Sequence, residues 1–194
     1  MANTYINRTS GTPTSQKKCT ISFWLKMAKV TADMHIFDTY TDASNRSHIQ
    51  LDTADKCDIR FRVSNVNIGR LVTTRVFRDP AAWMHIVVAL DTTQSTEADR
   101  IKLYINGTQE TSFTTATYPS LNADVNLSGT HTIGAYGGGG NYFDGLLSHV
   151  HFSDGYAYDA STFGSTDSTT GEWKINTSPS FTLGTNGFTI LKDG

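Results

Sequence analysis

Two histidines, His149 and His151, stand two residues apart in the run from Leu146 to Phe152. Alternate residues of a β-strand project from the same face, so both imidazoles can reach one metal ion. The alternative is that both are polar residues on the solvated face of a strand. A metal site also needs further ligands, and no nearby cysteine or second histidine pair can be placed from the sequence.

Oxygen ligands flank the same run. Asn141, Asp144 and Asp154 are candidates for a calcium site, although Ca²⁺ takes about six to eight oxygens and no compact ligand loop is visible. The alternative is turn chemistry, because Asp144-Gly145 and Asp154-Gly155 suit tight turns. Calcium is therefore the one cofactor left open, and otherwise we expect none.

Sugar recognition requires an aromatic face and a few hydrogen-bonding partners. Trp24 and Tyr104 lie opposite the apolar faces of their strands, and Trp24 can equally pack beneath a covering loop or a partner chain. Tyr136, Asn141 and Tyr142 add two rings and an amide beside the glycines at 137–140. These five residues are the candidate ligand-binding set.

Catalytic patterns are weak. Glycoside hydrolysis needs two carboxylates about 5–10 Å apart, yet the glutamates are Glu97, Glu110 and Glu172, and none has a second carboxylate at alternate strand spacing. No Gly-x-Ser-x-Gly motif occurs. We expect a protein without enzymatic activity.

Composition narrows the class of partner. The 194 residues carry 16 basic and 18 acidic side chains, a net charge of −2, which does not favour binding to nucleic acid. No apolar run approaches the ~20 residues that span a bilayer, and no secretion signal precedes Tyr5, so we expect no membrane insertion. Cys19 and Cys57 are expected to be buried thiols. The length suits one domain over residues 1–194.

Period-two alternation dominates the chain and positions these side chains. It predicts strands at 20–27, 48–52, 58–63, 84–90, 101–105 and 146–152, the last with Leu146, Val150 and Phe152 inward. Asn106-Gly107 predicts a tight hairpin turn, and Asp159 caps at most one helical turn before Gly164. The region from Asp91 to Arg100 should be an exposed loop. Many short strands indicate an all-β antiparallel sandwich of the jelly-roll type.

Several strings add a family resemblance. They are Phe77 to Gln94 followed by Arg100 to Gly107, Tyr5 to Thr9, Tyr142 to Leu146, Val150 to Gly155, Phe163 to Asp167, Thr170 to Trp173 and Gly184 to Phe188. The chain resembles the laminin-G/concanavalin A-like jelly-roll lectin module. More narrowly, it resembles modules of bacteriophage structural and tail-fibre proteins of the marine or cyanophage type.

The resemblance implies a virion component that works by binding. We expect a fibre, adhesin or capsid-surface module whose partners are host-surface glycan and other virion proteins, assembled as a homo-oligomer, with a trimer expected by analogy with fibres. Two alternatives stay open: a purely structural capsid decoration or assembly protein, and a polysaccharide-degrading enzyme.

Overall fold

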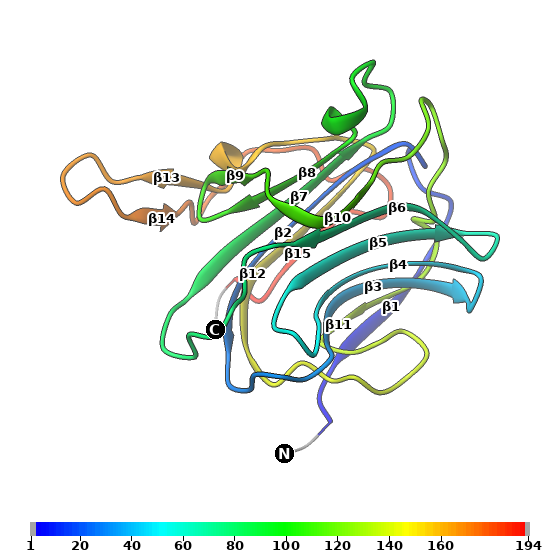
Figure 1. Cartoon of the computed structure of the whole chain (residues 1–194). Coiled ribbons are helices and arrows are strands. Elements are labelled where there is room, and N and C mark those ends of the chain that lie inside the picture. The colour runs from blue at the N-terminus through cyan, green and yellow to red at the C-terminus, as the bar shows by residue number, and fades with distance from the viewer. Residues whose placement is uncertain (1–2, 193–194) are drawn as a thin grey trace.

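The structure is a computed structural model, and it describes residues 3–192. Two antiparallel sheets stack face to face (Figure 1), which confirms the predicted jelly-roll sandwich. The larger sheet has seven strands, in the spatial order β1 (Ile6–Ser10), β11 (Gly129–Ile133), β3 (Met34–Asp42), β4 (Asn45–Leu51), β5 (Cys57–Val63), β6 (Val66–Thr73) and β10 (Phe113–Thr117).

The smaller sheet has six strands, in the order β15 (Phe188–Ile190), β12 (Gly145–Asp154), β2 (Lys18–Met27), β7 (Met84–Asp91), β8 (Ile101–Ile105) and β9 (Thr108–Glu110). A separate hairpin of β13 (Gly164–Thr166) and β14 (Trp173–Ile175) projects from the sandwich (Figure 1).

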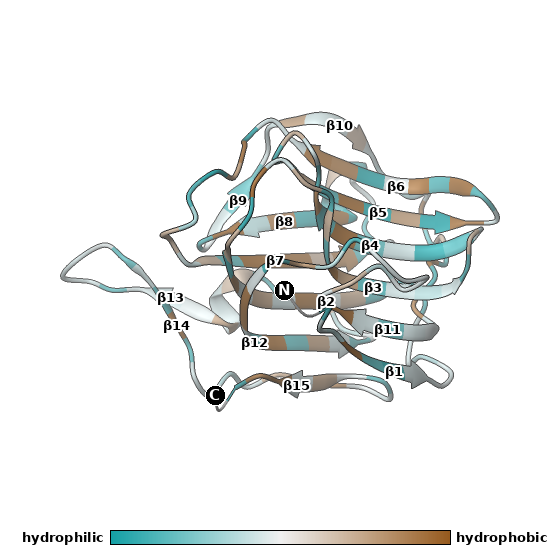
Figure 2. Ribbon diagram, turned by 90° about the horizontal axis from the view of Figure 1, so that it is seen from below, coloured by the Kyte–Doolittle hydropathy of each residue, from teal (hydrophilic) through white to brown (hydrophobic). Residues whose placement is uncertain are grey.

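The core lies between the two sheets and follows the predicted alternation. Along β2 the inward residues are buried apolar side chains: Cys19, Ile21, Phe23, Leu25 and Met27. Figure 2 shows hydrophobic and hydrophilic positions alternating along β5 and β6 of the larger sheet. Each large side chain buried in this way contributes roughly 1.5–3 kcal/mol.

Both cysteines are buried and unbridged, as the sequence predicted. Burial raises the pKa of the Cys19 and Cys57 thiols far above its ordinary value, and nearby carboxylates act in the same direction. The two thiols are therefore inert packing residues.

The predicted turns are present. Asn106 and Gly107 have φ angles of 47° and 80° and join β8 to β9. Asp159 accepts a hydrogen bond from the Ser161 amide and caps η2 (Ala160–Thr162), the single helical turn before Gly164. The 91–100 connection holds a second short turn, η1 (Glu97–Asp99), although Asp91 and Thr92 at its start are buried rather than exposed. None of the helices within residues 3–192 has the length and hydropathy that a bilayer crossing requires.

A β-bulge in β12 corrects one prediction. Leu146 is 59% exposed, not inward, because it pairs with outward-facing Lys26. The register then shifts by one residue near His149, whose φ is 47°, and only beyond this bulge do Val150 and Phe152 face the core. One extra residue in a strand moves every later side chain to the other face.

Candidate functional site

The outer face of the smaller sheet is covered by the chain that follows β12. Val87 on this face is buried with Ala160 and Phe163, and four further aromatic residues pack around them: Tyr104, Tyr158, Trp173 and Phe181. Tyr104 is therefore a packing residue beneath this segment.

Trp24 lies under the same cover. Its ring stacks on His85 at 5.0 Å, and His85 stacks in turn on Trp173 at 6.0 Å, with both distances between ring centroids. The prediction groups Trp24 and Tyr104 with the glycine-loop residues, but Trp24 and Tyr104 lie on the outer face of the smaller sheet, whereas Tyr136, Asn141 and Tyr142 lie on the connection between β11 and β12.

His151 also packs beneath the covering segment. It is buried, its Nδ1 lies 3.0 Å from the Thr189 hydroxyl, and its ring stacks on Phe163 at 5.3 Å between centroids. Burial lowers the pKa of His151 to about 4. His149 is the bulge residue, and its ring centroid lies 6.4 Å from that of His151. No third histidine, cysteine or carboxylate among residues 3–192 joins this pair in a metal-binding group.

The three predicted calcium ligands do not converge. Asp144 precedes β12 and Asp154 ends it, and a ten-residue strand spans about 30 Å. Asp154 is fully buried, and its Oδ2 accepts hydrogen bonds from the Thr14 and Asn186 amides at 2.8 and 3.0 Å. These residues do not fit a single calcium site, because no ion can contact both ends of the strand.

The connection between β11 and β12 brings the remaining candidates together. It is held against β3 by hydrogen bonds from the His35 amide to the Asn141 carbonyl at 2.9 Å and from the Gly137 amide to Asp38 Oδ2 at 3.0 Å. Tyr136, Asn141, Tyr142 and Asp144 all lie on this connection. It separates two pockets, which both include Asp33 and Asn141 in their walls.

The first pocket, here called the rim pocket, measures about 780 Å³. Its walls include Tyr5, Asp33, Asn141, Tyr142 and Asp144. The rings of Tyr5 and Tyr142 have centroids 6.1 Å apart and are inclined by 36°, and Tyr5 is 48% exposed. The pocket therefore combines accessible aromatic surface with an amide and carboxylates.

The second pocket, here called the sheet pocket, measures about 600 Å³ and lies on the outer face of the larger sheet. The strand register aligns Asp38, His48, Arg60 and Arg70 in one row across β3, β4, β5 and β6. Adjacent strands lie about 4.8 Å apart, so these side chains are neighbours.

Asp58 binds the two arginines of this row. Its Oδ2 lies 2.8 Å from Arg60 Nη2 and 2.8 Å from Arg70 Nη2, and its Oδ1 accepts from Arg70 Nε at 3.1 Å. At the other end of the pocket, Arg46 donates to the Tyr136 hydroxyl, and the Tyr136 ring meets that of His35 edge-on at 5.2 Å between centroids.

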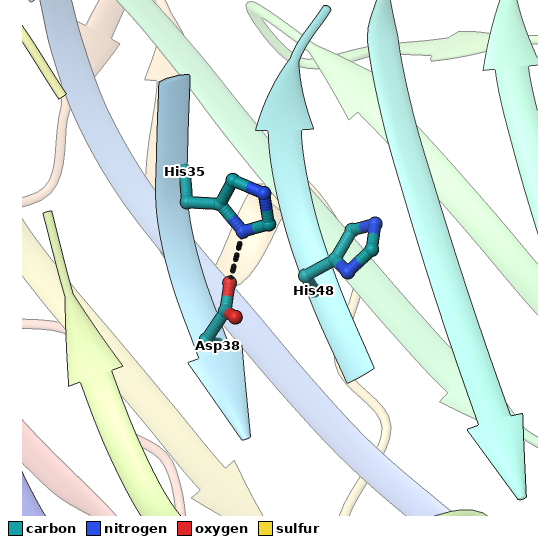
Figure 3. Close-up of side chains that lie close together, drawn as sticks. All are labelled: His35, Asp38 and His48. Atoms are coloured by element: carbon teal, nitrogen blue, oxygen red, sulfur yellow. Dashed lines mark hydrogen bonds and ion pairs between the residues drawn. The ribbon is translucent and has the colours of Figure 1, made fainter. Parts of the chain in front are cut away.

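His35 and His48 are buried residues at the floor of the sheet pocket, and Asp38 lies next to His35 on β3. Figure 3 shows the three side chains together. All three are buried, and His35 Nδ1 lies 2.6 Å from Asp38 Oδ1. Burial raises the pKa of the Asp38 carboxyl, and the hydrogen bond from His35 opposes this shift. Burial, followed by the positive potential of His35 and Arg60, lowers the pKa of His48 well below its ordinary value.

An irregularity in β3 hides this cluster from the residue pattern of the sequence. A bulge at Ile36 shifts the register of β3 between His35 and Phe37, so that His35 and Asp38 share a face although they are three residues apart. Regular alternation places such residues on opposite faces. The three-residue spacing of His35 and Asp38 therefore predicts neither strand β3 nor the shared face of these two side chains.

A family model described as the concanavalin A-like lectin/glucanases superfamily matches residues 1–162. No curated protein sequence matches the chain.

Solved structures show a similar fold at low identity. A heptameric SAP-like pentraxin from Limulus polyphemus has a TM-score of 0.60 and 16% identity, over 96% of this chain and 88% of the pentraxin. Domain 4 of the arabinanase AbnA from Geobacillus stearothermophilus, in complex with arabinotriose, has a TM-score of 0.50 and 17% identity, over 73% of this chain and 63% of that one. Mouse laminin α1 domains LG4-5 have a TM-score of 0.53 and 14% identity, over 77% of this chain and 38% of the laminin chain. The chain thus spans less than two thirds of the last two structures.

Proposed function

The chain belongs to the concanavalin A-like lectin/glucanases superfamily, and on this premise we propose that it is a carbohydrate-binding module without catalytic activity. The arabinanase domain with a similar fold was solved in complex with arabinotriose, which supports the choice of ligand class. We place the saccharide in the rim pocket.

The ring pair of exposed Tyr5 and half-buried Tyr142 is the observation that carries this proposal. The apolar faces of a sugar ring pack on aromatic side chains, while its hydroxyls need nearby donors and acceptors. Asn141, Asp33 and Asp144 supply amide and carboxylate groups in the same walls. Among the described residues of this lining, Lys29 is the one cation. A sugar hydroxyl can both donate and accept a hydrogen bond, so sugar hydroxyls can pair with this mixture of amide, carboxylate and ammonium groups.

Replacing Tyr142 with alanine should weaken saccharide binding at least tenfold, a loss of about 1.4 kcal/mol. The reason is that the variant loses one of the two stacking rings. A printed glycan array identifies a bound saccharide, and calorimetry with that saccharide compares the variants.

Tyr156→Ala is the matched control, because Tyr156 is an exposed tyrosine outside the walls of both pockets. It should bind as the wild type does. A silent array, or equal losses in the two variants, would rule out the rim pocket as a saccharide site.

The absence of catalysis is part of the proposal. Glu97, Glu110 and Glu172 lie in η1, in β9 and next to β14, outside the walls of both pockets. Asp58, a buried carboxylate in the walls of the sheet pocket, is bound by two arginines. Incubation with the bound polysaccharide should therefore release no reducing ends, and measurable release would contradict this part.

For the biological setting, we propose a bacteriophage virion component, on the strength of the sequence strings that resemble phage fibre modules. Many copies on one particle multiply a weak individual affinity, so a homo-oligomer, and a trimer by analogy with fibres, suits an adhesin. Mass spectrometry of purified particles should detect the chain, and its consistent absence from them would refute this placement.

A second candidate function is structural contact with other virion subunits. Ile6, Leu146 and Leu191 are exposed apolar residues around the rim pocket, a surface that also suits a protein partner. The glycan array separates the two functions, because only a glycan-binding module responds to it.

A further inference from the structure

His48 is a buried polar side chain without hydrogen bonds. It is 4% exposed, and neither Nδ1 nor Nε2 has a hydrogen-bond partner among the described residues. A buried group left in this state costs about 1–3 kcal/mol, and native proteins seldom leave both nitrogens of one ring unsatisfied. The ring lies in the wall of the sheet pocket, and both nitrogens are covered by neighbouring atoms, so an ion that binds them sits just beneath the pocket surface.

His35 faces the same space and is already oriented by a carboxylate. Its Nδ1 lies 2.6 Å from Asp38 Oδ1, and a second contact, from the Gly137 amide to Oδ2, fixes the carboxylate. With the proton on Nδ1 donated to Asp38, Nε2 presents a lone pair. Histidines that bind metal ions commonly donate the other ring N–H to a carboxylate in this way.

We propose that His35 and His48 bind a divalent transition-metal ion of the zinc class at the floor of the sheet pocket, with Asp38 as the positioning residue. Figure 3 shows these side chains side by side on β3 and β4. Potential ligand atoms of the three residues lie within 4.8 Å of one another. Ligand atoms around a tetrahedral zinc ion are about 3.4 Å apart, so the two imidazoles must turn to bring one nitrogen of each to that separation.

The ligand chemistry selects the class of metal. Neutral imidazole nitrogens favour zinc, copper and nickel, whereas calcium and magnesium require a shell of oxygens. The pocket walls balance Arg46, Arg60 and Arg70 against Asp33, Asp52 and Asp58, and Asp38 adds a carboxylate beneath them. Water or a ligand oxygen from the pocket would fill the remaining coordination positions.

The test is a zinc titration of the full chain after removal of metal with EDTA. Calorimetry should show one site per chain, and substitution with Co²⁺ should give the visible absorption of a nitrogen-ligated ion. His48→Phe should abolish this binding, a loss of more than about 100-fold, because it removes both nitrogens but keeps a ring. Asp38→Asn should weaken zinc binding about 10–100-fold.

The stability of His48→Phe without metal shows whether a loss of zinc binding results from misfolding. Its nitrogens make no hydrogen bond within the described chain, so without metal the variant should unfold at the wild-type denaturant concentration or higher. Zinc should raise the denaturant concentration at the midpoint of unfolding of the wild type, but not that of His48→Phe. His149→Asn, at a histidine outside this cluster, should bind zinc as the wild type does.

Absence of zinc binding, or unchanged affinity in His48→Phe, would overturn the proposal. Preference for Ca²⁺ over Zn²⁺ would overturn it as well. These outcomes are independent of saccharide binding, because the calorimetric titration contains metal and protein alone.

Discussion

Replacing Asp58 with asparagine is expected to lower the free energy of unfolding by about 3 kcal/mol. Asp58 has a side-chain exposure of 1% and pairs with Arg60 and Arg70, whose side chains are 18% and 33% exposed. The variant keeps the shape of the side chain but leaves two guanidinium groups without their shared carboxylate. Removal of one member of a buried pair costs about 3–5 kcal/mol, and we expect the lower end because Arg70 can turn toward solvent.

Urea unfolding measures this loss as a lower midpoint at an unchanged slope. Asp167→Asn is the matched control, because Asp167 pairs with Lys174 at 2.7 Å in the exposed β13–β14 hairpin. An exposed pair of this kind contributes less than about 1 kcal/mol. Equal losses in the two variants would contradict the view that Asp58 holds the arginines of the sheet pocket in place.

Most of the fold was predicted from the alternation of apolar and polar residues along single strands. The apolar face of β2, the central strand β7, the Asn106-Gly107 turn and the Asp159 cap follow from local sequence and are present in the structure. Each depends on interactions within a few residues, and these can be recognised without knowing which strands pair.

Features that depend on bulges or on strand register could not be predicted in the same way. The bulge at Ile36 hides β3 and the shared face of His35 and Asp38, and the bulge near His149 turns Leu146 outward. A bulge leaves little trace in residue types, because it inserts one extra residue of any kind into the alternation.

The candidate site was predictable only in part. The residues of the β11–β12 connection were selected because rings and an amide adjoin glycines, and they do lie together at two pockets. The row of Asp38, His48, Arg60 and Arg70 comes from four strands, and its members become neighbours only through the pairing register. For Trp24 the sequence predicted the outer face of its strand but not what covers that face. The covering segment, with Trp173, lies more than a hundred residues further along the chain.

Acidification is expected to destabilise the fold through His85. Trp173 Nε1 donates to His85 Nδ1 at 3.0 Å, so the ring proton lies on Nε2, 2.9 Å from the Ser22 hydroxyl. Protonation of Nδ1 would set two N–H groups against each other in a buried stack. Burial, followed by the nearby His151, lowers the pKa of His85 to about 3.

The sign of the effect follows from linkage. An unfolded histidine has a pKa of about 6.5, so between pH 6.5 and 3 the unfolded chain binds a proton at His85 that the folded chain does not. The contribution of neutral His85 to the free energy of unfolding is fully present above pH 6.5. It falls as the pH decreases through this window and levels off near pH 3. The total loss is on the order of 5 kcal/mol, with about 2 kcal/mol lost by pH 5, at about 1.4 kcal/mol per pH unit.

Denaturant unfolding at pH 7, 6 and 5 measures this slope before most carboxylates titrate. In His85→Gln the amide oxygen can accept from Trp173 and the amide nitrogen can donate to Ser22, but neither group titrates. The variant should therefore lose about 2 kcal/mol less than the wild type between pH 7 and 5. If the two proteins instead lose equal stability, or if NMR shows the His85 ring titrating near pH 6.5 in the folded chain, then the stack of Trp24, His85 and Trp173 does not keep this histidine neutral.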